Sequence, residues 1–211
     1  MNFDKVAPFY SFLEKIAFGN KLQVARIAFL ERLTRSQNIL LIGEGRGRVL
    51  AEILRNNSQA TITVVESSSS MVYMIKKTVQ PDELKRVTFV NSSFQKFFCR
   101  KKFDAVCTCF FWDCFSEKEL RSGLSQMHKL TQSKGLWINV DFAFLPSSSV
   151  FSNLPHKFTL HILYGFFQIS CGLTVNNLTP IGPIASQVGF ELAESLKFNA
   201  PSLSSEIYLR T

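Results

Sequence analysis

The chain has 211 residues, of which 46% are hydrophobic and 19% charged, with 24 Lys and Arg against 16 Asp and Glu. This composition excludes an intrinsically disordered or collagen-like chain, and the length predicts a single domain. The whole net charge of +8 falls in residues 1–141, whereas residues 142–211 hold equal numbers of basic and acidic side chains. From Phe142 to Phe190 the only charged side chain is Lys157, so this segment is the apolar part of the chain.

The basic excess is compatible with nucleic acid, an anionic membrane or an anionic substrate as partner, and equally with solubility alone. The densest basic run, Arg100-Lys101-Lys102, follows Phe97-Phe98 and is too short for a binding arm. We interpret it as a solvated turn. Nucleic acid is not expected as a partner, because the aromatic residues near the expected pocket mouth lack neighbouring cations apart from Lys157, while peripheral membrane contact and the oligomeric state are left open.

Residues 1–20 contain two acids and two lysines and no apolar core of a secretory leader. We therefore expect a cytoplasmic protein whose five cysteines are reduced. Cys107, Cys109 and Cys114 cluster in the sequence, but they form no CxxC pair and have no histidine nearby, so no metal site is predicted.

The predicted elements start with two amphipathic helices, over residues 6–18 and 21–33. Buried apolar runs then alternate with helical segments. Strands are predicted at 39–42, 61–65, 87–90, 103–108 and 135–142, and helices at 49–54, 71–77 and 116–130. Ser116 and Glu119 form a capping box at the start of the last of these helices.

The remaining chain is predicted to hold a helix over 158–173, a short helix over 180–188 and a final hairpin of strands 190–198 and 206–210. Residues 158–178 are long enough to cross a bilayer, but polar side chains and two glycines interrupt the run. We therefore expect a core or cavity-lining helix there.

This order of elements predicts an α/β fold: a Rossmann-like, doubly wound, seven-stranded, mostly parallel sheet with a C-terminal antiparallel hairpin and helices on both faces. Within the single domain, 1–211, we expect N-terminal helices in 1–36, a cofactor-binding core in 37–142, and a substrate cap with closing strands in 143–211.

The most informative stretch is Gly43-Glu44-Gly45-Arg46-Gly47, which lies between a predicted strand and a predicted helix. Glycines in such a turn let the backbone approach a ligand closely. Glu66 ends the next strand, 19 residues after Gly47, where an acid can accept both hydroxyls of a ribose. Turn and acid together indicate an adenosine-containing cofactor. Arg48 departs from the dinucleotide fingerprint, so a dinucleotide is not expected.

The G-x-G-x-G spacing resembles the class I S-adenosylmethionine-dependent methyltransferases. The resemblance runs from Ile39 to Thr211 and is carried by the glycine turn, Glu66, the segment 103–106 and the stretch from Leu130 to Asp141. The opening, residues 3–10, is similar to that of quinone-biosynthesis and related small-molecule methyltransferases. The resemblance implies S-adenosyl-L-methionine as cofactor and methyl transfer as activity.

The resemblance also implies which residues surround the cofactor. The methionine part would be lined by Gly43, Glu44, Gly45 and Gly47, and the ribose would be held by Glu66. The adenine would be bordered by Ser67, Met71, Ser92, Ser93 and Phe94. The floor would be formed by Thr108, Cys109 and Phe110, with Tyr10 closing over the cofactor.

Two positions depart from the family pattern. The family usually has an acid two residues before the first glycine, where this chain has Leu41, and often one at the end of the third strand, where it has Ser93. Our hypothesis is that Glu44 substitutes for the first of these acids.

Methyl transfer from a sulfonium is an in-line displacement that depends mainly on approach geometry, so a catalytic base is not obligatory. If one is used, the candidates are Asp113, Asp141 and His156, with His161 as a further histidine in the apolar segment. Each also has a purely structural interpretation: the acids can bond loop amides, and the histidines can be core residues.

The leading interpretation is methyl transfer to a small, apolar or aromatic acceptor, because the apolar segment coincides with the expected substrate cap and aromatic residues gather near it. Two alternatives remain open: an RNA or protein methyltransferase, and a catalytically silent Rossmann-like protein that binds a ligand.

Overall fold

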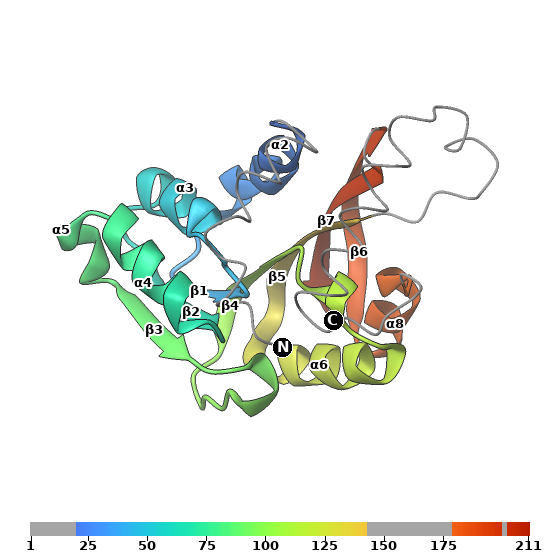
Figure 1. Cartoon of the computed structure of the whole chain (residues 1–211). Coiled ribbons are helices and arrows are strands. Elements are labelled where there is room, and N and C mark those ends of the chain that lie inside the picture. The colour runs from blue at the N-terminus through green and yellow to red at the C-terminus, as the bar shows by residue number, and fades with distance from the viewer. Residues whose placement is uncertain (1–19, 143–178, 200–201) are drawn as a thin grey trace.

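The computed structural model describes residues 20–142, 179–199 and 202–211 (Figure 1). The predicted helices over 6–18 and 158–173, together with Tyr10, His156 and His161, lie outside the described residues. The division of 1–211 into three parts stays a prediction.

A seven-stranded sheet with the order β3-β2-β1-β4-β5-β7-β6 forms the centre of the described structure. Its strands are β1 (Asn38–Ile42), β2 (Thr61–Glu66), β3 (Val87–Asn91), β4 (Phe103–Cys109), β5 (Thr131–Phe142), β6 (Phe190–Asn199) and β7 (Ser202–Arg210). Strands β1 to β5 are parallel, and β7 pairs antiparallel with β5 and β6. The predicted fold class is therefore confirmed.

Helices cover both faces of this sheet (Figure 1). One group consists of α2 (Lys21–Ile27), the 3-10 helix η2 (Leu30–Leu33), α3 (Arg48–Asn56), α4 (Ser69–Thr78) and the short α5 (Pro81–Leu84). The other consists of α6 (Glu117–Leu130) and α8 (Ile181–Gln187), with the 3-10 turns η3 (Phe94–Lys96) and η4 (Trp112–Cys114).

Alternation along β1 shows how the two cores are built. Ile39 and Leu41 pack with the buried residues of α2, α3 and α4, whereas Leu40 and Ile42 pack with those of α6 and α8. Because successive side chains of a strand point to opposite faces, a strand covered on both sides must be apolar throughout. This is why the continuous apolar run of β1 could be recognised in the sequence.

Several element boundaries differ from the prediction, and one short helix was not predicted. The helix expected over 21–33 stops at Ile27, and Phe29 leaves the helical region with φ −125° before η2 begins. Strand β5 starts at Thr131 instead of 135, with an irregular register opposite β4. The four-residue helix α5 was not predicted, since it is only one turn long.

Strand β7 also starts earlier than predicted, at Ser202 instead of 206. The reason is that its serines are partnered inside the protein: Ser205 is fully buried, and its hydroxyl donates to the carbonyl of Ala25 in α2 at 2.6 Å. The predicted capping box of α6 is present, with the Ser116 and Glu119 side chains each bonding the other's backbone N–H. In the described ranges, no helix has the length and apolarity needed to cross a bilayer.

Candidate active site

A cavity of about 330 Å³ opens beyond the carboxyl ends of β1, β2 and β4. Strand β1 lies between β2 and β4, so this is the point at which the strand order reverses, where doubly wound sheets bind ligands. The structure brings together around it most of the residues predicted to hold the cofactor: Gly43, Glu44, Gly45, Glu66, Ser67, Met71, Ser92, Ser93, Phe94, Cys109 and Phe110. Their role in cofactor binding stays a prediction.

The glycine turn forms one wall of the cavity. Gly43 and Gly45 have φ values of +68° and +62°, which favour glycine, and the Gly43 N–H donates to the Val65 carbonyl at 2.9 Å. A Cβ added at Gly43 would lie 2.5 Å from Cδ2 of Phe111, whereas one added at Gly45 would have no atom within 4 Å. Gly43 is thus required by packing, while Gly45 presents its backbone to open space.

Glu66 connects the second strand to this turn. Its carboxylate accepts hydrogen bonds from the backbone N–H of Gly45 at 3.1 Å and of Ser68 at 2.9 Å, and the side chain is only 6% exposed. Burial raises the pKa of Glu66, and these hydrogen bonds oppose the rise. The backbone N–H and the side chain of Ser67 also bond this carboxylate, so a ligand hydroxyl would share or replace one of these hydrogen bonds.

Glu44 places a second carboxyl group in the wall. One of its oxygens accepts from the N–H groups of Val49 at 2.8 Å and Leu50 at 3.0 Å, which are free donors in the first turn of α3. Loss of water around this group raises its pKa to about 7, and nearby Glu66 adds to the rise while Arg26 opposes it. Leu41, where the family pattern has an acid, is buried in the core. The acid at this edge of the turn is therefore Glu44.

Two residues predicted to bind the cofactor are not among those that line the cavity. Gly47 has φ +79° at the start of α3, and a Cβ there would lie 3.1 Å from Ile75, so the packing of α3 against α4 requires this glycine. Thr108 is fully buried; its hydroxyl donates to Asn139 at 2.9 Å and accepts from the Trp137 indole N–H at 2.8 Å. Neither residue lines the cavity, and both instead hold together the elements that carry its wall.

The two described candidates for a catalytic base, Asp113 and Asp141, also lie outside the cavity lining. Asp141 ends β5 and accepts from the backbone N–H of Trp112 at 3.2 Å and of Phe142 at 2.9 Å. Asp113 accepts from the Cys114 thiol at 3.2 Å, and Cys114 does line the cavity. Burial raises the pKa of both acids, and for Asp141 the neighbouring Asp113 adds to the rise.

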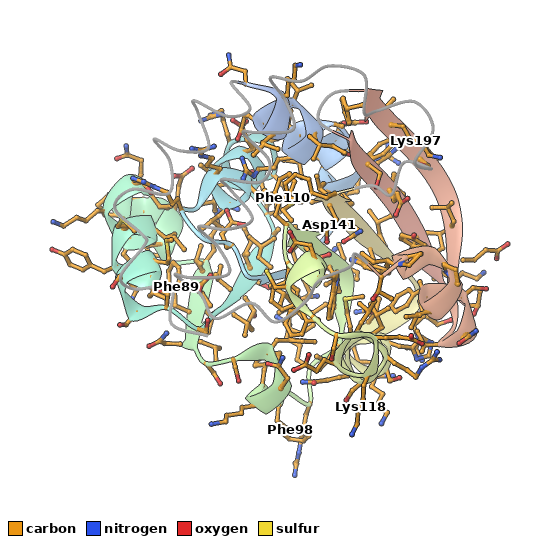
Figure 2. All side chains as sticks on the ribbon, turned by 45° about the vertical axis from the view of Figure 1, so that its right-hand side comes forward. Phe89, Phe98, Phe110, Lys118, Asp141 and Lys197 are labelled. Carbon is orange, nitrogen blue, oxygen red and sulfur yellow. The ribbon has the colours of Figure 1, made fainter. Side chains whose placement is uncertain are left out.

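Aromatic side chains form a second part of the cavity wall. Phe111, which packs against Gly43, lies 4.8 Å from Trp112, 4.9 Å from Phe115 and 6.2 Å from Phe94 between ring centroids. Phe110 adopts a left-handed backbone conformation with φ 53°, and its N–H donates to Val140. Figure 2 shows Phe110 and Asp141 in the middle of the molecule. This part of the wall is therefore apolar and aromatic.

Several cavity residues were not predicted as cofactor ligands, and Arg26 is the most informative of them. Only 8% of it is exposed, although it is charged, and its guanidinium lies 4.8 Å from the centre of the Phe110 ring. The sequence held a usable signal: Arg26 falls on the same helical face as Leu22, Ala25 and Phe29, where an amphipathic helix has apolar residues. Other lining residues that were not predicted as ligands are Arg46, Arg48, Val49, Val65, Gln95, Phe111, Cys114, Phe115 and Glu119.

Comparison with known proteins supports the interpretation of this cavity. Residues 39–135 match the family described as "Methyltransferase domain". No curated protein matches the chain by sequence. Among solved structures, an O-methyltransferase family protein from Burkholderia thailandensis superposes with a TM-score of 0.69 at 18% identity. The match covers 95% of this chain, which spans 58% of that protein.

Two further structures are similar over nearly their whole length. The N-methyltransferase NodS from Bradyrhizobium japonicum, in complex with S-adenosylhomocysteine, gives a TM-score of 0.67 at 11% identity and covers 92% of this chain and 90% of its own. The 1,6-didemethyltoxoflavin-N1-methyltransferase from Burkholderia thailandensis, with bound 1,6-didemethyltoxoflavin and S-adenosylhomocysteine, gives a TM-score of 0.63 at 15% identity. That match covers 98% of this chain and 88% of that protein.

The family match and the fold agree with each other. Residues 39–135 match the methyltransferase-domain family, and the described residues share the fold of these methyltransferase structures.

Proposed function

We propose that this protein binds S-adenosylmethionine in the cavity at the ends of β1, β2 and β4 and transfers its methyl group to a small, apolar or aromatic acceptor. The observation that carries the proposal is the joint position of the glycine turn and Glu66: residues 21 positions apart meet in one hydrogen bond at the wall of one cavity. The methyltransferase-domain match over residues 39–135 supports it.

The residues of the wall fit the cofactor's chemical groups. Glu66 lines the cavity with a carboxylate that suits ribose hydroxyls, and Gly45 leaves open space in which a ligand can approach the backbone. Glu44 and Arg26 provide one acidic and one basic group for the amino and carboxylate ends of an amino acid. When bound, the cofactor supplies a methyl group on a sulfonium, which is already activated for displacement.

The acceptor class is inferred from the aromatic wall. Phe110, Phe111 and Phe115 line the cavity, and aromatic walls favour planar or apolar ligands while excluding water. Most of the apolar segment from Phe142 to Phe190 lies outside the described residues. The described part of the chain therefore supports an apolar acceptor through these phenylalanines.

We also propose a route for a proton when the acceptor carries an O–H or N–H group. The Cys114 thiol lines the cavity and donates to Asp113, so a proton released at the acceptor can pass to the thiol sulfur while the thiol proton passes to Asp113. The close pair of Asp113 and Asp141 retains one proton more readily than two isolated acids, which leaves one carboxylate as the final acceptor.

Isothermal titration with S-adenosylmethionine and S-adenosylhomocysteine tests the binding part of the proposal. We expect the wild type to bind both ligands, and Gly45→Ala to lose at least about tenfold in affinity, because the new methyl group fills the open space next to the turn. Gly189→Ala is the matched control: Gly189 also has positive φ, at +95°, but its Cβ would meet His128 and it does not line the cavity.

Two results would contradict this function. No heat at millimolar ligand with the folded wild type would leave the silent ligand-binding alternative as the better account. Equal losses of affinity in Gly45→Ala and Gly189→Ala would show that the effect comes from backbone strain and not from the cavity.

A further inference from the structure

A second feature lies at the opposite edge of the sheet from the cavity, in the loop between η3 and β4. Phe98, in this loop, is 83% exposed, more than any other large apolar side chain of the described residues. Lys96, Arg100, Lys101 and Lys102 surround it in the sequence and are all exposed. Residues 84–103 contain no acid, so no carboxylate of the loop itself offsets these charges.

The backbone on which Phe98 sits is fixed. The side-chain amide of Gln126 in α6 donates to the carbonyls of Phe94 and Phe97, each at 2.8 Å. Phe97 itself is buried in the core between α6 and the sheet. Of these two adjacent phenylalanines, Phe97 therefore anchors the loop in the core and Phe98 points outward. Figure 2 shows Phe98 at the outer edge of the molecule.

The same surface continues onto the end of α6 and the start of β5. The Gln132 side chain in β5 donates to the Lys102 carbonyl at 3.5 Å, which joins this strand to the loop. The end of α6 adds the exposed Lys129 and the start of β5 the exposed Lys134, and residues 120–140 contain no acid either. We call Phe98 together with the six cations Lys96, Arg100, Lys101, Lys102, Lys129 and Lys134 the basic edge.

We propose that the basic edge docks the protein on an anionic lipid bilayer, with Phe98 inserted among the headgroups. A bilayer surface is the partner that fits both properties at once: exposed aromatic side chains partition into its interfacial region, and clustered cations are attracted to its anionic headgroups. The fixed loop backbone favours insertion, because little ordering of the loop is needed on docking.

A single-stranded nucleic acid fits this surface less well. Such ligands are bound along a groove by several aromatic side chains on which successive bases stack. The basic edge offers one exposed aromatic side chain, and in the described part of the chain the other exposed aromatic residue, Tyr73, lies on α4.

Docking at this edge leaves the cavity facing away from the bilayer, since the loop precedes β4 whereas the cavity lies beyond its end. The basic edge therefore acts independently of the proposed methyl transfer. It would hold the protein at a membrane whether or not the cavity binds S-adenosylmethionine.

Co-sedimentation with vesicles tests the proposal. We expect the full chain to sediment with vesicles of phosphatidylcholine and phosphatidylserine but not with phosphatidylcholine alone, and to be released by salt. Phe98→Ser should lower the partition coefficient by about fivefold or more, and Arg100→Gln combined with Lys102→Gln by about tenfold or more.

Tyr73→Ser is the matched control, because Tyr73 is also exposed, at 58%, and lies 4.5 Å from the ammonium of Lys77. It should keep wild-type partitioning. Thermal unfolding and S-adenosylhomocysteine titration of each variant check that the fold is unchanged. Failure of the wild type to bind the mixed vesicles, or an equal loss in Tyr73→Ser, would overturn the proposal. So would single-stranded RNA binding that is tighter than vesicle binding and is weakened by Phe98→Ser.

Discussion

Two pairs of acids lie near the carboxyl edge of the sheet, and the pKa of each acid is raised by loss of water. Glu44 and Glu66 line the cavity, and each accepts backbone N–H groups of the glycine turn or of the helix that follows it. Asp113 and Asp141 lie behind the wall and reach the cavity only through the Cys114 thiol. All four groups are carboxyl groups, so the two pairs differ only in their access to the cavity.

The comparison teaches that a buried acid and its raised pKa do not by themselves indicate a catalytic group. Asp141 accepts backbone N–H groups on both sides of the aromatic wall, from Trp112 and Phe142, and so fixes the end of β5 to the turn after β4. Substitution in the enclosed pair should therefore change stability and the proposed proton transfer but not cofactor affinity, whereas substitution in the cavity pair should also change ligand affinity.

The largest effect is expected for Asp141→Ala. Removal of this carboxylate leaves buried N–H groups without acceptors, and we expect the free energy of unfolding to fall by about 3 kcal/mol. Asp141→Asn keeps one of the two acceptor oxygens and removes the repulsion from Asp113, so it should cost less than Asp141→Ala, although its NH2 group leaves the second N–H without an acceptor. Urea denaturation measures both. Equal losses in the two variants would show that the hydrogen bonds to the loop are not what Asp141 contributes.

For Glu66→Ala we expect S-adenosylhomocysteine affinity to fall by about 100-fold, or about 2.7 kcal/mol, because the variant loses charge-assisted hydrogen bonds to the ligand and the one that holds Gly45. Titration calorimetry measures the affinity. Glu117→Ala, which changes an exposed acid of α6 outside the cavity, is the control and should bind normally. Unchanged affinity in Glu66→Ala would mean that the ribose is not held there.

A pH-dependent effect is expected for Glu44→Gln. The pKa of Glu44 is about 7 in the folded protein and 4.5 without its environment, so its contribution to stability is complete below pH 4.5 and is lost as the pH rises through 7. The Glu44→Gln variant has no titrating carboxyl at this position, so its stability does not fall in this way as the pH rises. Between about pH 5 and about pH 8, the wild type should lose about 2 kcal/mol more unfolding free energy than Glu44→Gln, after discounting for solvent at the partly buried group.

Glu66 is present in both proteins but interacts with Glu44, so this difference reports the titration of Glu44 together with its effect on Glu66. Denaturation at a series of pH values gives the two curves. Parallel curves would show that Glu44 does not titrate in this window.

The smallest effect is expected for Thr108→Val. The substitution leaves the Trp137 indole N–H and the Asn139 amide oxygen without their partner, at a cost of about 1 kcal/mol of unfolding free energy. Because Thr108 does not line the cavity, S-adenosylhomocysteine affinity should be unchanged. A clear loss of affinity would place Thr108 in the site after all.

The parts of the fold that were predictable are those with a short-range pattern. The apolar run of β1 and the alternation of strands and helices were sufficient for the sheet, and the positions of Gly45 and Glu66 followed from the spacing of turn and acid. The boundaries that were wrong depend on distant partners. Ser205 belongs to a strand because the carbonyl of Ala25, 180 residues away in sequence, accepts a hydrogen bond from its hydroxyl.

The site was less predictable for the same reason. Arg26 is separated from the glycine turn in the sequence, and only the packing of α2 brings it to Phe110. The resemblance placed Thr108 with Cys109 and Phe110, but Thr108 and Cys109 are successive strand residues that point to opposite faces, and Phe110 follows the strand with φ 53°, so only Cys109 and Phe110 line the cavity. Whether an acid opens onto the cavity or stands behind it, as for Glu44 and Asp141, depends on side-chain direction that no spacing encodes.

The order of the last two strands has a consequence for how the sheet assembles. In the described sheet β6 pairs with β7 alone, and β7 lies between β5 and β6, although β6 comes first along the chain. Strand β6 can therefore be added to the sheet only together with β7. The edge of β5 stays unpaired until the later strand arrives, and its pairing with β7 joins residues far apart in sequence, which makes it a slow step of folding.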